Sequence, residues 1–111
     1  MLRRTAYLEQ RLSIGLLKIE DGKDYLQYIS SYGCLVCGQP NPDRDHLETV
    51  GMGGNRKRYM WEDFTCIPLC RMHHTERHTN MKKFEDKYRI NLWKEQSRLL
   101  RRWLRYEQGK E

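Results

Sequence analysis

The sequence predicts a small α+β domain stabilised by a metal ion. All four cysteines and all four histidines fall between residues 34 and 78 of the 111-residue chain. Two short segments of β character lie inside that stretch, and segments of helical periodicity flank it. Only 38% of the residues are hydrophobic, so a chain of this length has a lean core and gains stability from a bound metal. We therefore expect one domain with one core.

The cysteines and one histidine have the spacing of a zinc site. Cys34 and Cys37 form a Cys-x-x-Cys pair, and Cys70 and His73 form a Cys-x-x-His pair. Two such pairs supply four ligands for tetrahedral zinc. Two disulfides are the alternative, which a reducing compartment disfavours. Cys66 is a further candidate ligand, but we assign it to the core because free cysteine is usually buried.

Four more residues of ligand type remain once that zinc site is filled. They are Asp45, His46, His74 and His78. A structural zinc site does not need them, so a second, open site is predicted. In a helix beginning near Cys70, residues 74 and 78 are four apart and share a face next to that of Cys70 and His73.

The N-terminal third is predicted to contain an arm and one helix. Residues 1–20 form an arm or helix whose apolar stripe is blurred. Asp21 is the expected cap of a short helix that runs to about residue 32 and that Gly33 ends.

The middle of the chain is predicted to form a β-hairpin. Residues 45–50 and 64–69 are its two short strands, and the second contains Pro68. Because proline cannot donate a ladder hydrogen bond, this strand must lie at an edge.

The C-terminal third is predicted to be helical. Thr79 and Asn80 indicate a break, residues 81–88 a further helical piece, and Asn91 the cap of a last helix that ends near residue 108. The inward stripe of this helix comprises Leu92, Gln96, Leu99, Leu100, Trp103 and Leu104, and its other side carries Lys94, Arg98, Arg101, Arg102 and Arg105.

Charge and hydropathy limit the partners and the compartment. Lys and Arg number 21 against 15 acidic residues, for a net charge of +6, which favours a polyanionic partner. No apolar run approaches the roughly 20 residues of a membrane span. The first residues also lack the apolar centre of a signal peptide. We therefore expect a cytoplasmic protein with no membrane partner.

The motifs together resemble those of the HNH endonucleases. The chain has the CLVC pair, an Asp-His step, a GMGG loop and then IPLCRMHHTERH. This order is similar to the treble-clef, ββα-metal fold, and within it to phage and prophage proteins related to recombination-enhancement nucleases. The resemblance is close over residues 34–78 and loose over FEDKYRINLW. It implies a nuclease domain over residues 21–111, with a metal core at 34–80 and C-terminal helices at 81–108.

The resemblance implies a role for each residue of the second site. Asp45, His74 and His78 match ligands of a catalytic divalent ion, which could be Mg²⁺, Mn²⁺, Ni²⁺ or Zn²⁺. His46 matches the general base, because a neutral imidazole accepts a proton near pH 7. Successive strand residues point to opposite faces, which favours separate roles for residues 45 and 46; His46 as a ligand is the alternative.

One family feature is missing from its usual place. The middle Asn of the HNH motif, which orients the loop bearing the base, is absent before IPLC, where Asp63, Phe64 and Thr65 stand. Asp63, Thr65 and Asn55 are candidates to replace it.

Two basic clusters are candidates for contact with DNA phosphates. Arg56, Lys57 and Arg58 follow a glycine-rich loop, and Arg98, Arg101 and Arg102 lie on the last helix. A solvated surface is the alternative for both clusters.

The expected function is hydrolysis of DNA phosphodiester bonds by a phage or prophage protein in a bacterial host. One alternative is a zinc-stabilised DNA-binding or recombination accessory module without catalysis. Another is a phage packaging partner of a terminase. Asp45, His74 and His78 also match the two-histidine, one-carboxylate set of non-haem iron oxygenases, but the adjacent zinc pairs and the lack of a barrel pattern argue against that chemistry.

Overall fold

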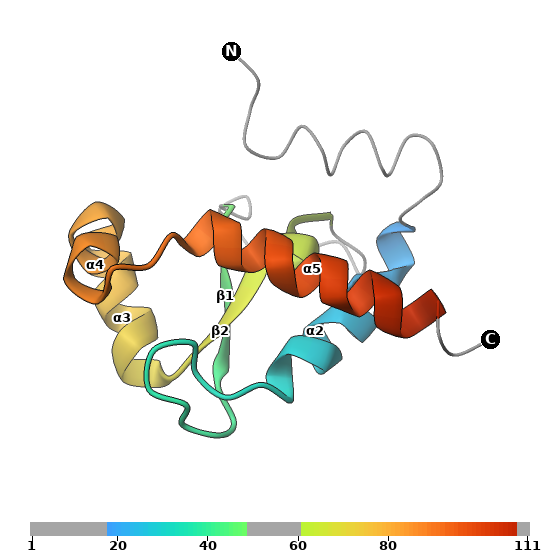
Figure 1. The fold of residues 1–111 in the computed structure, drawn as a ribbon, viewed down its shortest axis with the longest axis horizontal. Coiled ribbons are helices and arrows are strands. Elements are labelled where there is room, and N and C mark those ends of the chain that lie inside the picture. Colours follow the sequence, from blue (N-terminus) through green and yellow to red (C-terminus); the bar gives the residue numbers. More distant parts are fainter. Residues whose placement is uncertain (1–17, 49–60, 109–111) are drawn as a thin grey trace, which may run out of the picture.

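The structure is a computed structural model that describes residues 18–48 and 61–108. It is a mixed α+β domain with a two-stranded sheet (Figure 1). The elements in chain order are η1 (Ile19–Asp21), α2 (Gly22–Ser30), β1 (Asp43–His46), η2 (Trp61–Thr65), β2 (Cys66–Leu69), α3 (Arg71–Thr79), α4 (Met81–Tyr88) and α5 (Leu92–Gln108). Most of residues 1–20 and the cluster at Arg56, Lys57 and Arg58 lie outside the described residues.

The two strands are antiparallel, as the hairpin prediction requires, but their bounds differ from the predicted ones. Asp45 pairs with Ile67, and His46 pairs with Cys66. The first strand begins earlier than predicted, at Asp43, and ends at His46. Its sequence, DRDH, has no apolar alternation, so no hydrophobic signal marked its start.

The predicted second strand was also too long. Phe64 and Thr65 belong to η2, where the Thr65 hydroxyl donates to the carbonyl of Glu62 at 2.6 Å. This local bond favours a turn over extended backbone. Pro68 has the predicted edge position, because both strands of a two-stranded sheet are edges; its carbonyl accepts from the Leu35 N–H at 3.0 Å.

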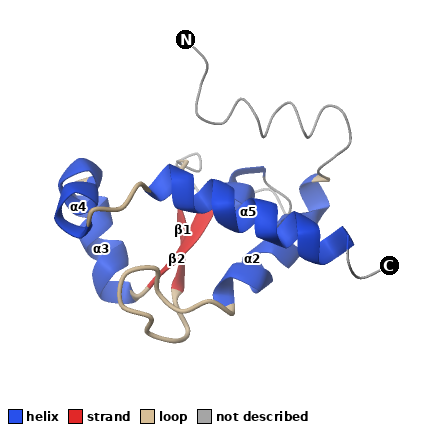
Figure 2. Cartoon of the chain, in the orientation of Figure 1, coloured by secondary structure: helices blue, strands red, loops and turns tan. Residues whose placement is uncertain are grey.

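Helix α5 crosses the strands and packs against α2, while α3 and α4 lie on the other side of the strands from α2 (Figure 2). The first core cluster joins α2, η2 and α5 and includes the fully buried Tyr25 and Phe64. Tyr25 donates its hydroxyl to the carbonyl of Cys66 at 2.9 Å, which ties α2 to β2. The predicted inward stripe of α5 is confirmed, with Leu104 half-buried and the other five members buried.

The helix ends match the predicted caps except at α2. Asn80 accepts from the Lys83 N–H, and Asn91 accepts from the Lys94 N–H, each at 3.0 Å. The break before α4 is shorter than predicted, because α3 continues through Thr79. Asp21 does precede α2, but its side chain makes no capping hydrogen bond because its own backbone is already helical. Helix α2 also ends at Ser30, two residues before the predicted end.

No helix within residues 18–48 and 61–108 is long and apolar enough to cross a membrane.

Candidate metal centres

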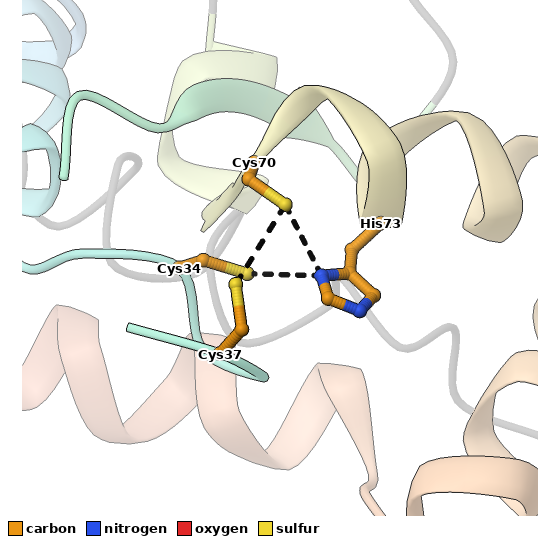
Figure 3. Close-up of side chains that lie close together, drawn as sticks. All are labelled: Cys34, Cys37, Cys70 and His73. Carbon is orange, nitrogen blue, oxygen red and sulfur yellow. Dashed lines mark hydrogen bonds between the residues drawn. The ribbon is translucent and has the colours of Figure 1, made fainter. Parts of the chain in front are cut away.

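Four predicted zinc ligands converge where the loop after α2 meets the start of α3. Cys34 and Cys37 lie on that loop, while Cys70 precedes α3 and His73 follows in its first turn (Figure 3). Gly33 allows the loop to close, because a Cβ on this residue would collide with the backbone of Gly38. The predicted ligand set is therefore assembled by two segments more than 30 residues apart.

The spacing of the four ligand atoms suits one tetrahedral ion. Cys37 Sγ and Cys70 Sγ are 3.8 Å apart, and the Nδ1 of His73 lies 3.6 Å from Cys34 Sγ and 3.1 Å from Cys70 Sγ. Zinc–sulfur bonds of about 2.3 Å and zinc–nitrogen bonds of about 2.0 Å imply sulfur–sulfur separations of about 3.8 Å and sulfur–nitrogen separations of about 3.5 Å. The Cys₃His cluster could bind a metal such as zinc.

The surroundings of Cys34 favour its thiolate form. Burial opposes ionisation of Cys34, but backbone hydrogen bonds from Cys70, Cys37 and Val36 outweigh it and lower the pKa of the Cys34 thiol to about 6. The ring of His73 meets the ring of Tyr88 edge-on at 5.2 Å between centroids. Cys34 is therefore suited to bind a metal as a thiolate, and the ring of His73 is held by its packing against Tyr88.

A second group of ligand-type side chains forms between β1 and α3. The Nε2 atoms of His74 and His78 are 2.9 Å apart, and they lie 3.3 Å and 3.6 Å from Oδ1 of Asp45. Donor atoms around one ion with bonds of 2.0–2.2 Å are about 3 to 3.5 Å apart. The structure thus brings together the three residues that the resemblance assigned to the catalytic ion.

Asp43 orients one of these histidines. It lies on the same face of β1 as Asp45, because strand residues two apart share a face. The Nδ1 of His74 donates to Oδ2 of Asp43 at 3.0 Å, which leaves the lone pair of Nε2 directed at Asp45 and His78. A carboxylate behind a ligating histidine is a recurrent feature of metal sites. With two ring nitrogens and a carboxylate oxygen converging, the donor set fits a divalent ion.

The second group is open to solvent at His78. The Asp45 side chain is fully buried and that of His74 is 20% exposed, whereas that of His78 is 60% exposed. A ligand could therefore approach from the His78 side. Burial, followed by the positive charge of Arg77, lowers the pKa of His78, so its ring favours the neutral form that binds metals.

His46 lies apart from this group and contacts Asp63. Its Nε2 is 2.9 Å from Oδ1 of Asp63, and its side chain is 21% exposed. The fully buried Cys66 completes a third possible metal group with these two residues. Burial raises the pKa of the Cys66 thiol, and the charges of Asp63 and Asp45 raise it further. Cys66 is therefore a core thiol, as its membership of the first core cluster indicates.

Thr65 binds the chain just after His46. Its hydroxyl accepts from the Glu48 N–H at 3.2 Å, and its carbonyl accepts from the Leu47 N–H at 3.3 Å. Of the three candidates to replace the missing Asn, Asp63 contacts the His46 ring and Thr65 the adjacent backbone, while Asn55 lies outside the described residues.

Two residues of the second site went unnoticed in the sequence, namely Asp43 and Arg77. Arg77 donates from Nε to Oδ2 of Asp45 at 2.7 Å and from Nη2 to Oδ1. Its position, four residues after His73, placed it on the buried stripe of α3. A charged residue on such a stripe needs a buried partner of opposite charge, and this signal could have identified the pair with Asp45.

The predicted basic face of α5 is present at the surface. Arg98, Arg101 and Arg102 are exposed. Arg98 also lies 3.4 Å from Glu95 one turn earlier. These residues are available to a polyanion, and Arg56, Lys57 and Arg58 lie outside the described part of the chain.

The fold and the Cys₃His cluster define a small α+β domain with a possible metal site. The model of the family "Protein of unknown function (DUF968)" matches residues 17–103, more than half of the chain. The chain belongs to this family. It is also 41% identical over 64 residues to "Uncharacterized protein YdfU" of Escherichia coli (strain K12), an alignment that covers 58% of this chain and 18% of that protein. No solved structure gives a significant match.

Proposed function

We propose that this chain is a metal-dependent endonuclease of the HNH type that hydrolyses DNA phosphodiester bonds. One observation supports the proposal above the others: Asp45, His74 and His78 converge beside the Cys₃His cluster, on a surface open at His78. A purely structural finger has no use for a second donor set of this kind. The exposed side chain of His78 marks the side from which a phosphate would approach.

In this proposal each metal group has its own task. Cys34, Cys37, Cys70 and His73 hold a structural zinc that fixes the start of α3. Asp45, His74 and His78 hold Mg²⁺, Mn²⁺, Ni²⁺ or Zn²⁺. When bound, that ion offsets the negative charge of the scissile phosphate and of the leaving oxygen.

His46 is the proposed general base. With its Nε2 hydrogen donated to Asp63, the neutral ring keeps the lone pair of Nδ1 and can accept a proton from water. Asp63 holds this tautomer, and Thr65 holds the backbone that follows His46. These two residues share the task of the missing Asn. This division leaves Asp45 as a ligand and favours His46 as base over His46 as ligand.

The proposal is tested by incubating supercoiled plasmid with the purified protein and Mg²⁺, Mn²⁺ or Ni²⁺, with EDTA as the metal-free control. We expect cleavage by the wild type. For His46→Ala we expect a rate lower by about 100-fold or more, the usual contribution of a positioned base, with zinc content unchanged. Equal cleavage by both proteins would contradict the role of His46. No cleavage by the wild type with any of these ions would contradict the nuclease.

A second candidate function is a DNA-binding or recombination accessory module without catalysis. The exposed arginines of α5 favour it, since they are available to DNA whether or not the second site binds an ion. A packaging role beside a phage terminase belongs to the same class. Under these functions the plasmid would be bound but not cut. The cellular compartment under either proposal is the bacterial cytoplasm.

A further inference from the structure

Arg77 is the buried cation of the described residues. Its side chain is 10% exposed, whereas every other Lys and Arg within residues 18–48 and 61–108 is exposed. Removing a guanidinium from water is costly unless the charge is paired and its N–H groups are bonded. The partner is the fully buried carboxylate of Asp45. Neither charge is tolerable at this depth without a counter-charge.

The contacts of Arg77 fall on the atoms that would hold the divalent ion. One terminal nitrogen, Nη2, donates to Oδ1 of Asp45 and lies 3.2 Å from Nε2 of His78. The same nitrogen is 3.4 Å from the carbonyl oxygen of His46. A guanidinium can only donate hydrogen bonds, so it uses the lone pairs of Asp45 and His78 that a divalent ion also requires.

Nε makes a different contact, with the other carboxylate oxygen. It donates to Oδ2 of Asp45 at 2.7 Å. This bond is on the side away from the two histidines, whose nearest contacts are with Oδ1. Arg77 can therefore keep Asp45 oriented through Nε even when Oδ1 binds another cation. Two positive groups this close still repel each other strongly in a buried site.

We propose that Arg77 and the divalent ion are alternative counter-charges for Asp45, so that Arg77 keeps the ion affinity of the second site low. The inference rests on the divalent site of the proposed function but not on DNA cleavage. It makes Arg77 a positioning residue that also competes with the ion. Metal binding at this site is then weak and reversible, in contrast to binding by the Cys₃His cluster.

The test is calorimetric titration of Mn²⁺ into the zinc-loaded full chain. Mn²⁺ is suitable because thiolate sites strongly favour zinc over it. Removing a like charge a few ångströms from the ion should tighten Mn²⁺ binding by Arg77→Gln about tenfold or more. Arg105→Gln is the matched control, because it makes the same substitution at an exposed arginine of α5 that contacts none of the residues of the second site. Screening by water should keep its effect to less than about twofold.

Thermal unfolding gives a second readout. Arg77→Gln leaves Asp45 without a counter-charge, so we expect a lower Tm than wild type without Mn²⁺ and a larger rise when Mn²⁺ is added. If this variant does not fold without the ion, Arg77→Met decides. It also removes the positive charge, but it fills the buried space with an apolar side chain of similar length, and Mn²⁺ should again bind more tightly than to wild type.

Mn²⁺ affinity that is unchanged or weaker in the folded Arg77 variants would overturn the inference. If the wild type nevertheless cleaves plasmid, the proposed nuclease function is retained and only the role of Arg77 is lost. Absence of Mn²⁺ binding in both wild type and Arg77→Gln would overturn this inference together with the divalent site.

Discussion

At the scale of single residues, the contact between His46 and Asp63 carries the proposed chemistry. The carboxylate accepts from Nε2 at 2.9 Å and fixes which ring nitrogen is free. We expect Asp63→Ala to lower the cleavage rate by on the order of tenfold, because the base loses its orientation but not its basic nitrogen. Plasmid cleavage under metal saturation measures this effect.

The conservative variant Asp63→Asn is the control. It retains an oxygen that can accept from Nε2, so its rate should exceed that of Asp63→Ala. Zinc and Mn²⁺ content should be equal in both variants. Equal rates in wild type and Asp63→Ala would remove Asp63 from the account of the base.

Gly33 is the second residue on which the site depends. A Cβ at this position would collide with the carbonyl of Gly38, so Gly33→Ala forces the Cys34–Cys37 loop to move. Overpacking of this kind costs about 1–3 kcal/mol, and zinc affinity should fall with it. Denaturant unfolding and competition with a zinc chelator measure the two effects.

Gly38→Ala is the matched comparison for Gly33→Ala. No atom lies within 4 Å of the added Cβ, but the backbone has a φ of +76°. The expected cost is about 1 kcal/mol of left-handed backbone strain, with little change in zinc affinity. A larger loss of zinc in Gly38→Ala than in Gly33→Ala would contradict the packing argument.

At the scale of elements, α5 combines a buried stripe with a basic outer face. If Arg98, Arg101 and Arg102 contact phosphates, changing all three to Gln should make the slope of log affinity against log salt shallower by about 2.7. Fluorescence anisotropy with duplex DNA at several salt concentrations measures this slope. The same change in net charge at Lys23, Lys82 and Lys83, which are also exposed, should alter it less. Equal slopes in the two triple variants would show that the α5 arginines make no specific contact with DNA phosphates.

Some elements and site residues could be predicted from the sequence, and others could not. The zinc pairs and the capping asparagines were predictable, because a turn or a helix start fixes their geometry locally. The predicted start of β1 was two residues too late. Its polar residues are specified by pairing with β2 and by contacts with α3 rather than by a hydrophobic pattern of their own. The same cause concealed Asp43 and Arg77, whose partners lie about 30 residues away in the sequence.

At the scale of the whole molecule, the chain is a lean domain in which helix α3 contributes histidines to both possible metal groups. The Cys₃His cluster adjoins the second core cluster, which joins the loop after α2 to β2, α4 and the start of α5. In a domain of this size, the free energy of metal binding contributes directly to folding. The second group is open to solvent at His78, whose side chain is 60% exposed. Loss of the two ions should therefore have unequal consequences.

The most direct test of this account is a count of bound metals by native mass spectrometry, with zinc and Mn²⁺ supplied, for wild type, Cys37→Ser and His74→Ala. We expect the wild type to retain one zinc through dialysis and to take up one Mn²⁺. His74→Ala should retain the zinc and lose the Mn²⁺, whereas Cys37→Ser should lose the zinc and unfold at a much lower temperature. A wild-type chain that is cooperatively folded without zinc, or a His74→Ala variant that loses zinc instead of Mn²⁺, would contradict the assignment of two separate sites.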